Sequence, residues 1–307
     1  MNEYSIKSYE TGFEEDQVRL GLEVIKDWVW PYQYNLEFLK NLYSSTDFDP
    51  NTALFCFKDK RMVGFTLARI GVQAGVVGPG VKKRAKLGAN LDLPRVLPNN
   101  EKAENLLMGR IIEKLKMKKV PFIQTRASTM HTNSIELVRK WGFNEVKDYP
   151  LGYKLYYYYD LKKENIKENK EDVERFEFDR DIEYCAISVS NFFKRTLEEA
   201  KKDIEEINNS EDLVSHLVIR KKGMLEGYCY ALPNNLNKDI IATFHLEASK
   251  EKYLKQLLVQ VIDDCLKKGS KYLLIDVIGG LLKFEKVFLN LGFDEVATWG
   301  IYEKDLS

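Results

Sequence analysis

Two segments of the chain are versions of one another: Trp141-Gly142-Phe143-Asn144-Glu145-Val146 and Leu291-Gly292-Phe293-Asp294-Glu295-Val296. The second begins 150 residues after the first, at 291 against 141. The same offset aligns two apolar series, namely Leu107, Ile111, Ile112 and Leu115 with Leu257, Val261, Ile262 and Cys265. Because self-similarity at a fixed period marks a repeated structural unit, the sequence predicts one fold used twice in 307 residues.

A further match lies upstream, between Met62-Val63-Gly64-Phe65-Thr66-Leu67-Ala68 and Leu225-Glu226-Gly227-Tyr228-Cys229-Tyr230-Ala231, at an offset of 163 residues. The first copy therefore carries about thirteen extra residues, which belong between Gly71 and Gly88. This insert is rich in glycine and then basic, with Lys82, Lys83, Arg84 and Lys86. It is either a mobile lid whose cations meet an acidic acceptor or the phosphates of a cofactor, or a solvated hairpin excursion.

The boundary between the copies lies in a charged and polar run from Lys162 to Glu174, which is typical of a solvated linker or an exposed helix. We therefore expect an N-terminal domain at 1–161, a charged linker at 162–172 and a C-terminal domain at 173–307. Hydrophobic periodicity predicts the same order of elements in each copy: a strand, two helices, a hairpin, a central strand, a long helix, a strand and a short helix. A closing strand at Tyr153–Leu161 follows in the first copy. In the second copy the first strand is expected at Val173–Phe178 and the last helix at Leu282–Leu291. Each copy is thus expected to be an α/β (α+β) domain with a mixed, mainly antiparallel sheet flanked by helices.

Composition excludes several classes of protein. Hydrophobic residues make up 44% and charged residues 31% of the chain, which rules out disorder and collagen-like repetition. The 47 Lys and Arg residues balance 47 Asp and Glu residues, so nucleic acid is an unlikely partner without a local basic patch. There is no apolar run of the ~20 residues that a membrane span needs, and we expect no membrane partner and a cytoplasmic protein. Single, scattered cysteines and histidines argue for free thiols and against a metal site.

The order of elements and the residues resemble a known family, the GNAT superfamily of acyl-CoA-dependent N-acyltransferases, in two tandem copies. The most specific likeness lies in the strand-helix-strand of Leu91 to Thr125 and in the stretch from His131 to Phe143, which looks like the family's closing helix with its Gly-Phe ending. The resemblance implies acetyl-CoA as co-substrate, with pantetheine inserted between two splayed strands and pyrophosphate at the N-terminus of the next helix. It also implies a small-molecule or peptide amine as acceptor, and a monomer or homodimer.

The sequence departs from the family's pattern at two places. The phosphate loop aligns with Pro98 to Ala103 in the first copy and with Ala248 to Tyr253 in the second, and neither segment contains glycine. The tyrosine position of the closing helix is held by Val138 in one copy and Phe288 in the other, and neither side chain can donate a proton. Backbone N–H groups make most pyrophosphate contacts, so the cradle can survive such divergence.

Candidate site residues follow from this alignment. An acyl-CoA is expected at one set of residues of the first copy: Val96, Leu97, Asn99, Asn100, Lys102 and Ala103. The alternative for this segment is an ordinary strand-to-helix turn capped by Asn99 or Asn100. Asp92, on the central strand, and His131, at the start of the closing helix, are the candidate acid–base pair, although either could be a structural polar group. In the second copy His245 and Glu247 alternate on one face of the equivalent strand.

The leading hypothesis is therefore an N-acetyltransferase that moves an acetyl group from acetyl-CoA to an amine, with the N-terminal copy as the active one. The aromatic residues Trp28, Trp30, Tyr32 and Tyr34 fall where the family builds its acceptor wall, or belong to the core. Two alternatives remain. One is a non-catalytic CoA-binding or scaffold protein on a degenerate fold, and the other is a Fem-like transferase that uses aminoacyl-tRNA and would need a basic groove.

Overall fold

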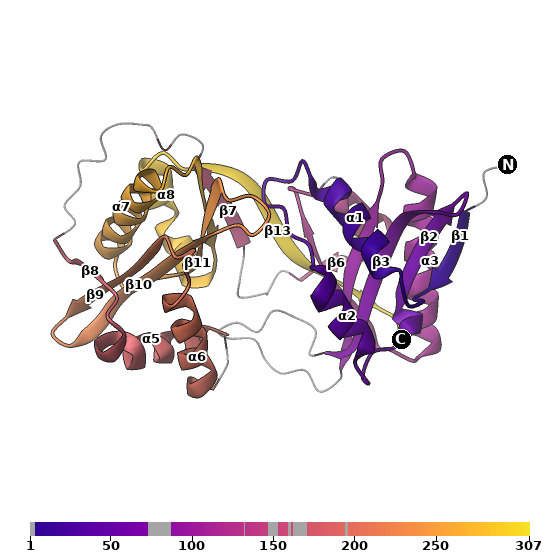
Figure 1. The fold of residues 1–307 in the computed structure, drawn as a ribbon, viewed down its shortest axis with the longest axis horizontal. Coiled ribbons are helices and arrows are strands. Elements are labelled where there is room, and N and C mark those ends of the chain that lie inside the picture. Colours follow the sequence, from indigo (N-terminus) through magenta and orange to yellow (C-terminus); the bar gives the residue numbers. More distant parts are fainter. Residues whose placement is uncertain are drawn as a thin grey trace. The chain divides into compact units, whose positions relative to one another are not determined.

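The structure of the protein is a computed structural model, which describes residues 4–72, 87–131, 133–146, 153–158, 161, 171–193 and 196–307. These residues form two compact units (Figure 1). The first unit takes in the described residues up to 146 together with Trp299–Ser307, and the second takes in those from 153 to 298.

The first unit is a sheet with the strand order β1-β2-β3-β4-β5-β13, in which β6 also pairs with β13. All its neighbouring strands are antiparallel except β4 and β5, which are parallel. Its elements have the following bounds: β1 Tyr4–Ser8, α1 Glu14–Ile25, α2 Leu36–Ser44, the 3-10 helix η1 Pro50–Thr52, β2 Ala53–Lys58, β3 Arg61–Val72, β4 Gly88–Val96, α3 Glu101–Met117, β5 Phe122–Ser128, α4 Ser134–Lys140, β6 Asn144–Glu145 and β13 Asp294–Asp305.

Helices cover both faces of this first sheet. Gly64 in β3 faces α3, and a Cβ added at this position would lie 3.2 Å from the Leu107 side chain. The next residue, Phe65, points to the opposite face and packs its ring on Phe55, which in turn meets Phe13 just before α1. Successive residues of β3 therefore face α3 and α1 in turn, and both layers are apolar.

The second unit has the strand order β7-β12-β11-β10-β9-β8, with β11 and β12 as its parallel pair. Its elements have the following bounds: β7 Tyr153–Tyr158, β8 Val173–Arg175, α5 Phe178–Phe193, α6 Leu197–Asn208, β9 Ser215–Lys221, β10 Met224–Pro233, β11 Ile240–Ala248, α7 Glu251–Lys267, β12 Tyr272–Val277, the 3-10 helix η2 Gly279–Phe284 and α8 Glu285–Asn290. Cys229 and Leu217 share a core with α7, whereas Tyr228 and Val218, one residue away in each strand, share a core with α5 and α6. The layers thus repeat those of the first unit, and the predicted α/β fold of two similar domains is confirmed.

The last strand of each sheet comes from the other half of the sequence. β7, which follows the first Gly-Phe segment, pairs with β12 of the second unit. The end of β13, which follows the second Gly-Phe segment, pairs with β5 of the first unit in a register from Trp299 opposite Ser128 to Asp305 opposite Phe122. The units defined by contacts therefore divide the chain differently from the sequence segments 1–161 and 173–307, and most of the expected linker, 162–170, lies outside the described residues.

Two predicted elements differ locally from the structure. The strand expected over Val173–Phe178 ends at Arg175, because Phe178 already begins α5. The helix expected over Leu282–Leu291 is a 3-10 turn followed by the short α8. None of the helices in the described ranges combines the length and apolar composition that crossing a membrane requires.

Candidate active site

A cleft of about 660 Å³ opens in the first unit. Its walls come from the end of α1 and the segment after it, from β4, from the start of α3, from β5 and from the start of α4. Six of the eight candidate acid–base and acyl-CoA residues line it: Asp92, Val96, Leu97, Asn99, Asn100 and His131. Lys102 and Ala103 are not in its lining, since the Lys102 ammonium lies over the Tyr4 ring and Ala103 is fully buried in the core.

The cleft lies where two parallel strands part. The pairing of β4 with β5 consists of Ala89 with Ile123 and Asn90 with Gln124. Beyond that point β4 continues to Val96 while β5 continues to Ser128. The Thr125 hydroxyl spans the beginning of the gap by donating to the Leu91 carbonyl at 2.7 Å. The predicted separation of these two strands is therefore present.

A bulge in β4 determines which side chains face the cleft. Leu67 of β3 pairs with Asp92 and Phe65 pairs with Arg95, so that Leu93 and Pro94 together oppose the single residue between Phe65 and Leu67. Proline cannot donate to a strand ladder and is typical of bulges. The extra residue brings Asp92 and Arg95, three positions apart, to the same face of the sheet.

Asp92 is an ionisable group in an enclosed position. Burial raises the pKa of its carboxyl group above the usual value for aspartate, and the nearby guanidinium groups of Arg69, Arg95 and Arg126 oppose that rise. A carboxylate whose pKa is raised is a better proton acceptor near neutral pH than an ordinary aspartate.

His131 lies against the aromatic wall of the cleft. Its ring stacks on Trp28 at a centroid distance of 3.8 Å and lies 6.0 Å from the ring of Tyr32. Burial, with the positive charge of Arg95 nearby, lowers the pKa of His131 to about 4, so the imidazole is neutral at pH 7. Its Nε2 atom is buried and has no hydrogen-bond partner in the described structure. Such an atom points to a partner that the protein itself does not supply.

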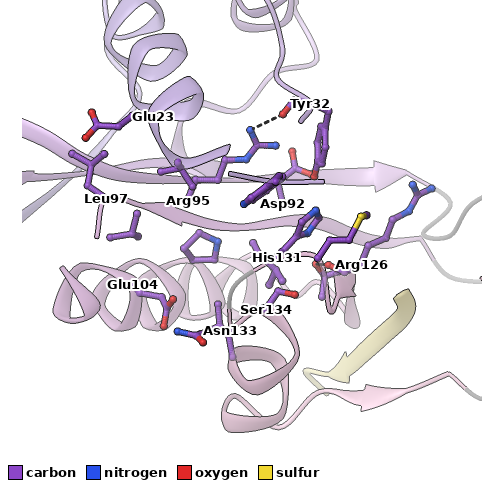
Figure 2. Close-up of a pocket in the computed structure, with 18 of the residues that line it drawn as sticks. Glu23, Tyr32, Asp92, Arg95, Leu97, Glu104, Arg126, His131, Asn133 and Ser134 are labelled. Carbon is purple, nitrogen blue, oxygen red and sulfur yellow. Dashed lines mark hydrogen bonds between the residues drawn. The ribbon is translucent and has the colours of Figure 1, made fainter. Parts of the chain in front are cut away.

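Arg95 ties the aromatic wall to the central strand. The side chain is only 9% exposed, and its guanidinium lies 5.3 Å from the Trp28 ring and 4.7 Å from the Tyr32 ring. It donates to the Tyr32 carbonyl at 3.2 Å, drawn as a dashed line in Figure 2, and to the side-chain oxygen of Gln33. Of the four aromatic residues considered for an acceptor wall, Trp28, Tyr32 and Tyr34 line the cleft, and Trp30 is not in its lining.

The start of α3 forms the other end of the cleft. Asn100 occupies the N-cap, but its side chain makes no capping bond; its amide group donates to the carbonyls of Leu97 and Pro98, and its oxygen accepts from the Tyr4 hydroxyl. The alternative of an asparagine-capped turn is therefore wrong for Asn100. Asn99 has a φ of 63°, in the left-handed region that asparagine tolerates.

The charges at the two ends of the cleft differ. Figure 2 shows Glu23 and Glu104 toward one end, and Asp92, His131 and Arg126 toward the other. Burial raises the pKa of Glu104, and the negative charge of Glu101 adds to the rise. The parted strands and the uncapped helix start are suited to the pantetheine and pyrophosphate of an acyl-CoA, whereas the two glutamates weaken the site for a polyanion.

The family's proton-donor position is apolar in both units. Val138 and Phe288 are fully buried in their respective cores. Neither side chain carries a polar atom, so neither can donate a proton.

The second unit holds a different set of groups at the equivalent strand. β11 pairs with β12 only from Ile240 to Thr243. Beyond this stretch, His245 Nε2 lies 3.5 Å from a Glu247 carboxylate oxygen and 3.3 Å from the Ser188 hydroxyl. Ser188 also donates to Glu247, and its bond together with that of His245 lowers the pKa of Glu247. The alternation expected for His245 and Glu247 is present, but both are held by a serine from α5.

Sequence reasoning missed the three arginines Arg69, Arg95 and Arg126, which come from adjacent strands. For Arg95 the available signal was Pro94, because a proline inside a strand indicates a bulge that changes which residues share a face. The basic residues Lys82, Lys83, Arg84 and Lys86 of the insert lie outside the described residues. Among the residues that are described, no group of three His, Cys, Asp or Glu side chains is arranged to hold a metal ion.

Neither a family model nor a curated protein matches the sequence. Solved structures do match. A GCN5-related N-acetyltransferase from Sphaerobacter thermophilus covers 99% of this chain and 96% of its own, with a TM-score of 0.66 and 12% identity. A GNAT-family acetyltransferase from Colwellia psychrerythraea has a TM-score of 0.62 over 97% of this chain and 99% of its own, also at 12% identity.

A tandem GNAT protein from the clavulanic acid biosynthesis pathway covers 99% of both chains, with a TM-score of 0.62 and 12% identity. At such low identity the likeness is one of fold. The match extends over the full length of a two-copy protein, in agreement with the repeat seen in the sequence. The chain therefore has the tandem GNAT fold.

Proposed function

We propose that the first unit is an N-acyltransferase that moves an acyl group, most simply acetyl, from coenzyme A to an amine. The observation that supports this most directly is the parting of β4 and β5 after Asn90, with a cleft at the opening. In a GNAT-type fold this opening is the place where the thioester arm of an acyl-CoA fits between strands. Val96, Leu97, Asn99 and Asn100 would contact that arm.

Acyl transfer to an ammonium acceptor requires protons to leave the nitrogen and one proton to reach the sulfur. Acyl-CoA supplies a thioester whose carbonyl carbon exchanges its bond to sulfur for a bond to the acceptor nitrogen. An ammonium acceptor has to lose one proton before it can attack and a second one as the amide forms, while the released thiol gains one. Asp92 is placed to take the first proton because burial raises the pKa of its carboxyl group. His131, which is neutral, is placed to orient the amine through a hydrogen bond.

The place of binding can be tested directly. Hydrogen exchange of the full chain with and without acetyl-CoA should show protection in peptides covering 91–105 and none in the equivalent peptides covering 243–255. Isothermal titration in the same buffer gives the affinity. Absence of binding at millimolar acetyl-CoA, or protection confined to the second unit, would refute the assignment to the first unit.

Turnover is tested with a panel of amines and detection of free thiol. Asp92→Asn should lower kcat/KM about a hundredfold, the lower end of what a general base contributes. Asp47→Asn is the matched control, because Asp47 is an exposed aspartate of the same unit outside the cleft lining. Equal loss in both variants would contradict the role given to Asp92.

A second candidate function is binding of CoA without transfer. It is favoured by the apolar, fully buried residues Val138 and Phe288 at the position of the family's proton donor. Acetyl-CoA binding with no amine acetylated across the panel, and with Asp92→Asn binding as tightly as the natural sequence, would select this function over catalysis.

A further inference from the structure

Three guanidinium groups converge at one end of the cleft. Arg69 comes from β3, Arg95 from β4 and Arg126 from β5, three adjacent strands of one sheet. All three line the cleft, and all three act electrostatically on Asp92. Arg69 and Arg95 also act on the Tyr34 hydroxyl, which lines the same end.

The contacts of the three arginines leave donor groups available. Arg95 directs one nitrogen to the Tyr32 carbonyl and the Gln33 amide oxygen. The central carbon of the Arg126 guanidinium lies 4.9 Å from the centroid of the Trp299 ring, and the side chain makes no hydrogen bond with another described residue. The Arg69 side chain makes no hydrogen bond with another described residue, and none of the three arginines forms an ion pair within 4.0 Å with a carboxylate in the described part of the chain.

The charges at this end do not balance. Three arginines are always protonated at physiological pH, and Asp92 is the one carboxylate on which all three act. Arg95 is buried, Arg69 is half-buried and Arg126 is exposed. Planar guanidinium groups suit a carboxylate, which can accept two parallel hydrogen bonds. The excess of cations is what an anionic part of a ligand would neutralise.

We propose that the acceptor is an amino acid, an amine that also carries a carboxylate. Its carboxylate would accept hydrogen bonds from Arg69 and Arg126, and its ammonium would donate to Asp92. The aromatic residues Trp28, Tyr32 and Tyr34 give the same end an apolar wall for a side chain. This inference rests on the proposed function for the identity of the reacting amine, but carboxylate recognition can be measured without turnover.

The binding experiment uses the full chain and two product-like ligands, N-acetyl-phenylalanine and N-acetyl-phenylalaninamide, which differ in the carboxylate alone. Titration calorimetry should give a Kd at least about tenfold lower for the acid, as one charge-assisted hydrogen bond contributes. Arg69→Gln and Arg126→Gln should each remove most of that preference. Arg110→Gln, an exposed arginine on α3 outside the cleft lining, is the matched control and should retain it.

The two proposals fail in different ways. Equal affinity for acid and amide, or no binding of either, overturns carboxylate recognition whatever the turnover results are. If the acid is preferred but L-phenylalanine and all other amines remain unacetylated with bound acetyl-CoA, carboxylate recognition stands and acyl transfer is refuted. The phosphonate analogue of N-acetyl-phenylalanine is the third ligand, and binding of this analogue to the exclusion of the carboxylate overturns the amino-acid assignment in favour of a phosphorylated acceptor.

Discussion

Tyr302→Ala is the substitution that tests the exchange of final strands. Tyr302 lies in β13, near the end of the chain, yet its side chain is 5% exposed within the core of the first unit. Its backbone pairs with Thr125 of β5 and with Glu145 of β6. Loss of this ring should therefore destabilise the first unit, although the residue lies more than 150 positions after residue 146, where the main part of that unit ends.

The magnitude follows from the buried area. A nearly buried aromatic side chain removes on the order of 170 Å² from water, which at ~25 cal/mol per Å² amounts to about 4 kcal/mol. Large-to-alanine substitutions of buried aromatic residues cost about 3–5 kcal/mol, which includes the cavity that remains. A loss of this size is a large part of the free energy of unfolding of a single domain. The population of molecules in which the first unit is unfolded should therefore rise strongly.

The assay is native-state hydrogen exchange read by peptide. In Tyr302→Ala, protection should fall in peptides of β4 and β5 and persist in those of β11 and β12. Phe293→Ala is the matched control, since Phe293 lies nine residues earlier and is 1% exposed in the core of the second unit, and there the pattern should be the opposite. If Tyr302→Ala loosened the second unit instead, the strand assignment would be wrong.

Three further predictions concern charge and capping. Glu104→Gln should lower the Kd for CoA about two- to fivefold, as expected for one less carboxylate at the helix start where we propose that phosphate binds, and titration calorimetry against Glu113→Gln measures it. The pKa of His131 is lowered to about 4, so the unfolded chain takes up the proton first, and the first unit should lose stability as the pH falls from about 6.5 toward 4; denaturant unfolding at pH 7 and pH 5 should show this loss reduced in His131→Gln. Thr196→Ala removes the capping box with Glu199 and should cost the second unit about 1 kcal/mol, with the Kd for CoA unchanged.

The repeat and the core could be predicted from the sequence because both depend on local patterns. Gly64 and Gly227 occupy matching positions, and each lies close to one leucine of the long helix: a Cβ would be 3.2 Å from Leu107 in one unit and 3.0 Å from Leu257 in the other. The leucines belong to the apolar series that the 150-residue offset aligns. Such packing constraints repeat with the fold and remain visible after the surfaces have diverged.

The exchange of β7 and β13 could not be predicted in this way. A strand's alternation shows that it has a buried face, but it does not show which sheet edge it joins, because the ladder is made by backbone groups common to all residues. The alternation over Tyr153–Leu161 predicts a strand of the first domain, and no element is predicted after Leu291. Nothing in the local sequence of either segment specifies β5 or β12 as the partner.

The bulge in β4 explains why the candidate acid–base residues were found and the arginines were not. With a strict period of two, Asp92 and Arg95 would lie on opposite faces, and the strand would present one charge to the cleft. Pro94 adds a residue and brings both to one side. In the second unit the positions opposite Tyr230 and Tyr228 are His245 and Glu247, where the first unit has Asp92 opposite Leu67 and Arg95 opposite Phe65.

Equivalent positions of the two units therefore hold different chemistry. In the second unit, His245 Nε2 and Glu247 both bond Ser188, whereas His245 Nδ1 is buried and has no partner in the described structure. In the first unit, Asp92 faces three arginines across a cleft, and His131 Nε2 has no partner in the described structure. A polar cluster satisfied internally contributes to stability, whereas one left unsatisfied at a cleft is suited to bind something else. Both units hold an unpartnered histidine nitrogen, so we assign the chemistry to the first unit because Asp92, His131 and the three arginines line one cleft there.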